Sequence, residues 1–159
     1  MGHYLEFKET GQGMVNIFYG REAATKKLER EYYCGMHPPY LSDENEDFIF
    51  IANGCGTSCI VGYLVPLDDD KEPIPFQDWV EMDLKNNFIL TLPPENDKRD
   101  VEVFRTDTFT SERFPTQVSC PLTDAYSCVD RVEVKAGIVT LYWNKAIEAK
   151  PFQYKLKPN

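Results

Sequence analysis

Short apolar runs, each ended by glycine, proline, asparagine or aspartate, recur along this chain and constrain its fold more than any other feature. The clearest example is a strand from Asp47 to Ala52, a glycine-rich turn from Asn53 to Ser58 and a return strand from Cys59 to Leu67. A second hairpin is predicted for Val129 to Val134 and Ile138 to Trp143, joined by a three-residue turn. Short strands separated by such turn signals are typical of antiparallel β proteins.

Further strands are predicted outside these hairpins, at residues 14–19, 88–92, 101–105 and 152–156. The stretch from Phe76 to Leu84 fits a helical turn or a strand, and residues 106–119 are polar, with no strand predicted there. About eight short strands predict a mainly β fold, an antiparallel β-sandwich or a barrel-like sheet pair. The length of 159 residues predicts a single domain over residues 1–159.

One segment, residues 21–33, has the pattern of a helix. Ala24, Leu28 and Tyr32 recur at four-residue spacing, and Glu22 and Lys26 form a favourable i,i+4 pair. Glycine and two prolines follow shortly afterwards. We therefore expect one short helix near residues 21–33.

The charge of the chain is strongly negative. It has 26 acidic and 17 basic side chains, a formal net charge of −9 and a mean hydropathy of −0.44. Such a field repels nucleic-acid phosphates and anionic membranes, so neither nucleic-acid binding nor membrane insertion is predicted. It suits a basic protein partner, although acidity alone can serve solubility. No apolar run approaches the roughly 20 residues of a membrane-spanning helix.

Four of the five cysteines form two pairs that are close in sequence: Cys55 with Cys59, and Cys120 with Cys128. Each pair lies between predicted strands, so we expect two loop-closing disulfides, with Cys34 left over. Fifteen arrangements of two disulfides and one free thiol are possible, and only proximity in sequence favours this one. Disulfides predict a periplasmic or secreted protein, whose export signal preceded Met1-Gly2-His3 and was removed.

The same cysteines fit other roles less well. A redox centre needs Cys-x-x-Cys at a helix start, whereas Cys55 and Cys59 are one residue further apart and lie between strands. Cys55 and Cys59 have the spacing of one zinc-binding knuckle, but the spacing of Cys120 and Cys128 does not match a second. Cys34 with a nearby histidine remains an alternative nucleophile or ligand pair.

Catalytic and metal motifs are incomplete. Asp43, Asn45 and Asp47 match the first three ligand positions of a calcium loop, but Phe48 stands where glycine is needed and Gly54 where glutamate is needed. Phosphate loops and the serine nucleophile elbow are absent from the sequence. We therefore predict no catalytic residue, no metal and no cofactor.

These features predict a non-enzymatic binding protein. Two acidic loops would steer a basic partner, and nearby aromatic residues would anchor it. The candidate contact residues are Asp43, Glu44, Glu46, Asp68, Asp69, Asp70, Glu72, Tyr40 and Trp79. The most concrete form is a periplasmic inhibitor or immunity protein that blocks a basic secreted hydrolase or toxin, such as a cell-wall lytic enzyme.

Two alternatives stay open at this point. One is a small extracytoplasmic enzyme, either a thiol–disulfide catalyst or a carboxylate-dependent hydrolase, based on Cys34, His37 and the many carboxylates. The other is a subunit of an envelope assembly, in which an edge strand such as Val101 to Arg105 pairs with a partner.

Overall fold

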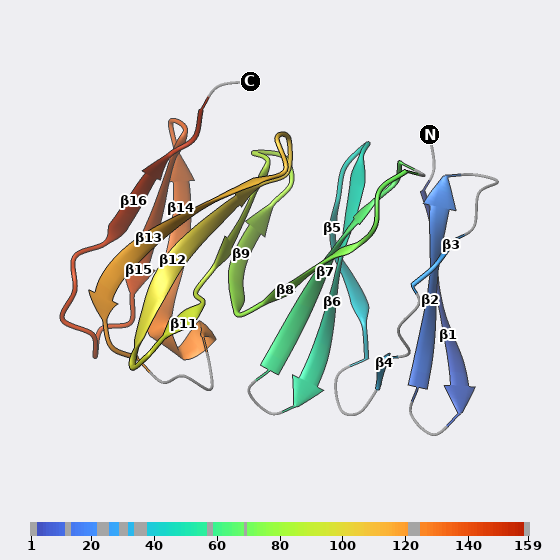
Figure 1. Ribbon diagram of the computed structural model, residues 1–159, viewed down its shortest axis with the longest axis horizontal. Coiled ribbons are helices and arrows are strands. Elements are labelled where there is room, and N and C mark those ends of the chain that lie inside the picture. The colour runs from blue at the N-terminus through green and yellow to red at the C-terminus, as the bar shows by residue number, and fades with distance from the viewer. Residues whose placement is uncertain are drawn as a thin grey trace. The chain divides into compact units, whose positions relative to one another are not determined.

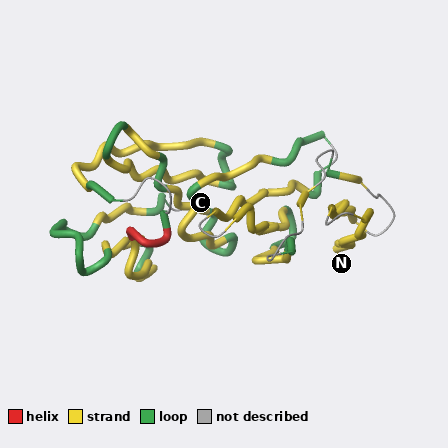
Figure 2. Tube along the Cα trace, turned by 90° about the horizontal axis from the view of Figure 1, so that it is seen from below, coloured by secondary structure: helices red, strands yellow, loops and turns green. Residues whose placement is uncertain are grey.

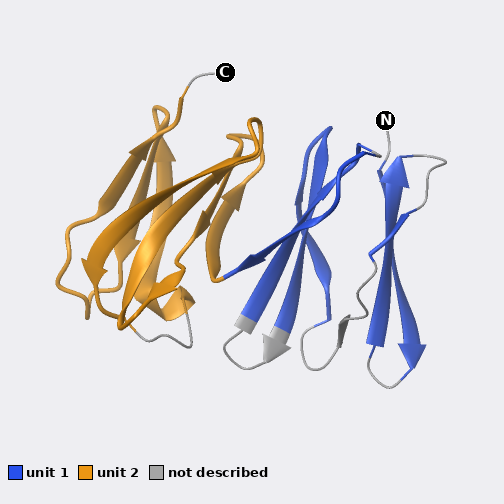
Figure 3. Ribbon diagram, viewed as in Figure 1, with its two compact units in different colours: residues 1–77 blue, residues 78–159 orange. Residues whose placement is uncertain are grey.

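The computed structural model describes residues 3–11, 14–21, 26–28, 32–33, 38–56, 59–68, 70–120 and 125–157. The chain divides into two compact units, Met1–Gln77 and Asp78–Asn159 (Figure 3). Both units consist mainly of antiparallel strands, and the helical segment drawn in Figure 2 is a 3-10 helix, η1 (Tyr126–Cys128). The mainly β, sandwich-like fold predicted from the sequence is confirmed.

Unit 1 contains two antiparallel sheets (Figure 1). In the first sheet β2 is central, with β1 on one side and the two short strands β3 and β4 on the other. The second sheet has the order β5-β6-β7-β8. The strands are β1 (His3–Gly11), β2 (Met14–Arg21), β3 (Lys26–Lys27), β4 (Tyr32–Tyr33), β5 (Tyr40–Glu44), β6 (Phe48–Gly56), β7 (Cys59–Pro66) and β8 (Ile74–Gln77).

The core of unit 1 forms because apolar residues alternate on these strands. Val15 and Ile17 on β2 pack with Ile49 and Ile51 on β6, and all four are buried. Alternate residues of a strand point to one face, so each sheet presents an apolar face to this core. Leu28, which the helical pattern had placed on an apolar face, is part of the same cluster.

Unit 2 also contains two antiparallel sheets. One has β12 at its centre, flanked by β10 and β11 on one side and β13 on the other, with β9 beyond β10. The second has the order β14-β15-β16. The strands are β9 (Trp79–Asp83), β10 (Phe88–Thr91), β11 (Pro94–Glu95), β12 (Lys98–Arg105), β13 (Thr110–Val118), β14 (Val129–Lys135), β15 (Ile138–Trp143) and β16 (Phe152–Lys155).

The core of unit 2 also draws on both of its sheets. Phe88, Leu90 and Val103 from the first sheet pack with Val139 and Leu141 from the second, and all five are fully buried. The hairpin predicted for β14 and β15 is confirmed. Its turn has positive φ at Ala136 and Gly137, the conformation that suits a tight hairpin.

The predicted helix near residues 21–33 is wrong where the structure describes that segment. Arg21 ends β2, Lys26 and Lys27 pair with Tyr19 and Phe18, and Tyr32 and Tyr33 pair with Val15 and Met14. The four-residue spacing that predicted a helix fits this arrangement equally well. Leu28 lies between the two short strands and is buried in the core that a helix would also have contacted. Ala24 and Glu22 lie outside the described residues.

Three other strand assignments also change. The interval at residues 106–119 contains a full strand, β13, whose Pro115 lies at an irregular step of the pairing with β12. The ambiguous stretch from Phe76 to Leu84 contains β8 and β9, separated by Asp78, whose φ is 53°. The sequence pattern also does not predict β1, because its inward apolar residues alternate with charged residues along an exposed edge.

The single domain predicted for residues 1–159 stays a prediction, since two compact units can still fold as one cooperative domain. Among the described residues, no helix has both the length and the apolar character needed to cross a membrane.

Candidate functional site

The two acidic loops singled out in the sequence meet at one end of unit 1. Phe48 at the start of β6 pairs with Pro66 at the end of β7, so the loops that precede and follow this hairpin lie side by side. The backbone N–H of Leu67 donates to the carbonyl oxygen of Asp47 at 2.8 Å. We call residues 43–47 and 67–72, as far as they are described, the acidic end of unit 1.

Side chains of the acidic end build its turns. Asn45 Oδ1 accepts the backbone N–H groups of Asp47 at 2.9 Å and Phe48 at 2.8 Å. Asp68 Oδ1 accepts the N–H of Asp70 at 3.3 Å. These are the local side-chain-to-backbone bonds that favour Asn and Asp in turns. The calcium-like spacing around Asn45 therefore has a structural explanation in the turn itself.

Three basic groups from the first sheet reach this end, in the order of the strands that carry them. His3 on β1 lies 3.5 Å from a carboxylate oxygen of Glu44, and Arg21 on β2 donates to the carbonyl oxygen of Glu46 at 2.8 Å. Lys26 on β3 approaches the carbonyl oxygen of Asp68 at 3.5 Å. At this end the first sheet thus contacts the second, with β1 beside β5.

These contacts leave most of the carboxylate surface exposed. Arg21 donates to a main-chain oxygen and also lies 3.7 Å from a carboxylate oxygen of Asp47, while Lys26 approaches a main-chain oxygen. The side chain of Asp47 is 73% exposed and that of Glu44 is 53% exposed. Glu46, Asp70 and Glu72 are exposed as well, and Asp69 lies outside the described residues. At the acidic end, carboxylates therefore outnumber the basic groups Arg21, Lys26 and Lys71, so its charge is net negative.

The two predicted aromatic anchors fall in different units. Tyr40 begins the edge strand β5 in the same sheet as the acidic end and is 48% exposed. Trp79 belongs to unit 2, is only 7% exposed and packs edge-on against Tyr126 with ring centroids 5.7 Å apart. Its assignment as a surface anchor is corrected to a buried packing role. The sequence misled here because Trp79 follows an acidic loop closely along the chain.

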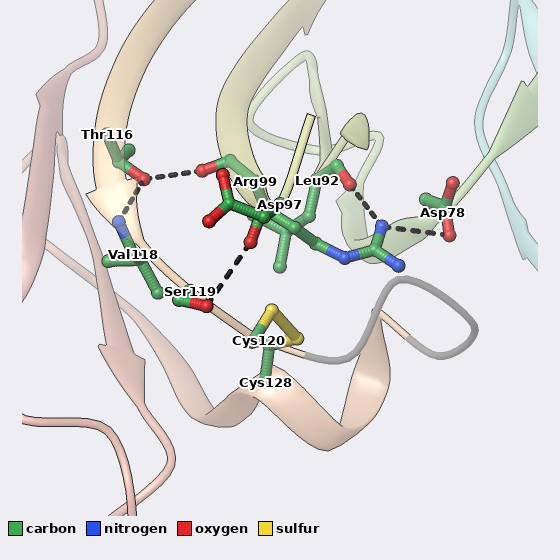
Figure 4. Close-up of a disulfide and its surroundings, with 9 residues drawn as sticks. All are labelled: Asp78, Leu92, Asp97, Arg99, Thr116, Val118, Ser119, Cys120 and Cys128. Atoms are coloured by element: carbon green, nitrogen blue, oxygen red, sulfur yellow. Dashed lines mark hydrogen bonds and ion pairs between the residues drawn. A yellow bond between two sulfur atoms is a disulfide. The ribbon is translucent and has the colours of Figure 1, made fainter. Parts of the chain in front are cut away.

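The disulfide between Cys120 and Cys128 is confirmed (Figure 4). Its Cα atoms are 5.8 Å apart, and both residues are buried in the core of unit 2, where they anchor η1. Burial keeps the sulfur atoms from solvent, which suits a structural staple rather than exchange chemistry. The side chains of Cys55 and Cys59, together with Cys34 and His37, lie outside the described part, so the second disulfide stays a prediction.

Figure 4 also shows Arg99, a buried arginine that the sequence pattern does not predict. Arg99 on β12 is 0% exposed, donates to the carbonyl oxygen of Leu92 at 2.5 Å and lies 3.1 Å from a carboxylate oxygen of Asp78. A buried guanidinium needs such partners because an uncompensated charge is costly in the interior. Its only sequence signal is its position within the apolar alternation of β12.

The edge strand proposed for an envelope assembly is also corrected. Val101 to Arg105 lies within β12, which pairs with β10 on one side and β13 on the other. This segment has no open edge to offer a partner. The alternation of apolar and polar residues in the sequence does not distinguish a central strand from an edge strand.

Carboxylates in unit 2 have shifted pKa values. Burial raises the pKa of Glu81, while a hydrogen bond from Arg105 lowers the pKa of Asp107. Hydrogen bonds from Lys157 and Tyr154 lower the pKa of Glu112, and one from Arg131 lowers the pKa of Glu133. The lowered values belong to ion-paired carboxylates, which is the pattern of structural pairs.

In the ranges the structure describes, no three His, Cys, Asp or Glu side chains come close enough together to hold a metal ion. The fold and site thus define an antiparallel β protein of two compact units, with a disulfide in the second and an acidic end on the first. Comparisons with protein-family models, with curated proteins and with solved structures find no match.

Proposed function

We propose that this chain is a non-enzymatic binding protein of the periplasm or the extracellular space, and that the acidic end of unit 1 receives a basic protein. The observation that carries the proposal is the convergence of two acidic loops, distant in sequence, at one end of the β6–β7 hairpin. The most concrete partner is a basic secreted hydrolase or toxin, which the chain would inhibit.

The location part of the proposal is supported by the buried Cys120–Cys128 disulfide. Disulfides persist in oxidising compartments and are rare in a reducing cytosol. A staple buried in a core is retained for stability, which fits a protein that works outside the cell.

The binding part is supported by electrostatics. Exposed carboxylates on a scaffold of paired strands speed the encounter with a cationic surface and fix its orientation. The loops are held by their own turn hydrogen bonds, so little ordering is needed on binding. The exposed ring of Tyr40 lies on the edge strand that leads into the same loops.

The test is inhibition and binding of a basic cell-wall lytic enzyme of the lysozyme type by the whole oxidised protein. We expect binding to weaken as salt is raised, and the association rate to fall by about tenfold or more in a Glu46→Lys/Asp70→Lys variant. No side-chain bond of the described structure involves the carboxylates of these two residues, so the fold should be retained.

A matched control reverses two exposed acids of unit 2, Asp97→Lys and Glu148→Lys, which changes the net charge equally. We expect this control to retain binding. If both variants lost binding equally, the loss would be due to net charge alone, and the acidic end would not be the binding site. Indifference of all basic enzymes tested, at low and at physiological salt, would refute the proposed partner class.

A further inference from the structure

The strand β1 differs from the other edge strands of the described sheets. Its pairing with β2 runs without interruption from His3 to Glu9, and β1 pairs with no other described strand. The pairing of β1 also has an irregular step, between Glu9 and Gly11, but this step lies at the end of the strand, and the regular run before it is longer than that of any other described edge. The other edges are short, contain proline or have an irregular step in their pairing, devices that prevent edge-to-edge association. These edges are β3, β4, β5, β8, β9, β11, β13, β14 and β16.

The surface of β1 is largely exposed and partly apolar. Phe7 lies opposite the buried Ile17, so it points to the core side of the sheet, yet it is 37% exposed. Tyr4, on the opposite face, is 39% exposed and donates to Glu6 at 2.6 Å. A long, regular edge with exposed aromatic residues is a template for another strand.

The charges on β1 select the strand that fits. In an antiparallel pair of two β1 strands centred on Phe7, residues pair so that their numbers total fourteen. Glu6 then lies opposite Lys8 of the other copy, twice by symmetry, and Phe7 lies opposite Phe7. Opposite charges and aromatic residues in direct cross-strand positions stabilise a sheet. The strand is thus complementary to itself.

We propose that β1 is a self-association site, at which two copies of the chain join β1 to β1 in antiparallel fashion about a two-fold axis at Phe7. The two β1-β2-β3 sheets then become one continuous sheet. A two-fold arrangement uses the same patch on both copies, which is the commonest form of homodimer. The net charge of −9 opposes the approach of two copies, but at physiological salt repulsion beyond roughly 8 Å is largely screened.

The experiment uses sedimentation velocity on the whole oxidised protein over a concentration series at physiological salt. Wild type should show a reversible monomer–dimer equilibrium. Glu6→Lys places a lysine opposite Lys8 of the other copy, and Lys8→Glu places a glutamate opposite Glu6. Because each change sets like charges against each other, each variant alone should weaken dimerisation by about tenfold or more.

Two further samples separate pairing from folding. An equimolar mixture of the Glu6→Lys and Lys8→Glu proteins restores opposite charges across the interface and should form a heterodimer. The double variant Glu6→Lys/Lys8→Glu restores them within one chain and should dimerise like wild type. A monomeric wild type, or single variants that dimerise as well as wild type, would overturn the proposal, as would a mixture that stays monomeric.

Discussion

The edge strands of the two sheets are packed together differently in the two units. In unit 2, β13 is an edge strand of one sheet and β16 is an edge strand of the other, and aromatic side chains pack between them. The ring centroid of Phe114 lies 5.3 Å from that of Phe152 and 5.7 Å from that of Tyr154. Glu112 on β13 accepts hydrogen bonds from Tyr154 at 3.1 Å and from Lys157 at 2.9 Å. Packing and charge thus join the two sheets of unit 2 along this side.

The corresponding side of unit 1, at β1 and β5, is closed only weakly. A polar contact joins the two strands there, with His3 Nδ1 3.5 Å from a carboxylate oxygen of Glu44, and Phe7 and Leu41 on these two strands remain 37% and 40% exposed. Along this side, packing joins the two sheets of unit 2, whereas unit 1 leaves apolar side chains exposed, which agrees with our proposal that unit 1 carries the contact surfaces. The following changes test that division, from the largest expected effect to the smallest.

Removing the buried arginine should have the largest effect. Arg99→Met deletes the charge that meets Asp78 and the donor that satisfies the carbonyl oxygen of Leu92, and we expect unit 2 to lose about 3 kcal/mol of unfolding free energy. Denaturant unfolding followed by tryptophan fluorescence reports on this unit, because Trp79 and Trp143, the two tryptophans of the chain, both lie in it.

An exposed arginine supplies the matched control for that variant. Arg131 is about half exposed and pairs with Asp130 and Glu133 at the surface. Arg131→Met should cost less than about 1 kcal/mol, because exposed ion pairs contribute little. Equal costs for the two arginines would mean that Arg99 does not support the interior of unit 2.

Removing the disulfide should have the next largest effect. The Cys120→Ala/Cys128→Ala variant opens a nine-residue loop, for which chain entropy predicts a loss of about 2.5 kcal/mol. Fluorescence should reveal an earlier transition of unit 2. A Cys55→Ala/Cys59→Ala variant should instead destabilise unit 1. Its unfolding transition followed by circular dichroism should then begin at a lower denaturant concentration than the transition followed by fluorescence. Coincident shifts in both variants would show that the two units unfold as one.

Lowering the pH should have the smallest of the three effects on stability. The loss of unfolding free energy should be small near neutral pH and should grow as the pH falls. Asp107, Glu112 and Glu133 have pKa values below their ordinary range, so they stabilise the fold at neutral pH and this stabilisation is lost as the pH falls through the lowered values. The raised pKa of Glu81 acts in the opposite sense, so Glu81→Gln should stabilise unit 2 at neutral pH.

This pH dependence is measured by denaturant unfolding of unit 2 at a series of pH values. An Asp107→Asn variant should show a flatter loss of stability in acid than wild type. An unchanged slope would mean that the contact between Asp107 and Arg105 contributes nothing to the stability of unit 2.

Local pattern was enough for much of the fold. Turn-forming residues between apolar runs were enough to predict the β6–β7 and β14–β15 hairpins, and the proximity of Cys120 and Cys128 was enough to predict their bond. The pattern failed at residues 21–33, where the spacing of Leu28 fits a helix and a pair of short strands alike. It also failed at β1 and β13, whose mixed composition reflects an exposed position at an edge.

The sequence by itself determined the two hairpins, the strong negative charge and the Cys120–Cys128 staple, because the hairpins and the staple depend on residues close together along the chain and the charge on composition alone. Only the tertiary structure decided which strands lie at the edges, that Trp79 and Arg99 are buried, and that the two acidic loops meet. These outcomes depend on which distant segments pair and pack. That choice is made by the burial of whole apolar faces, which a local pattern does not encode.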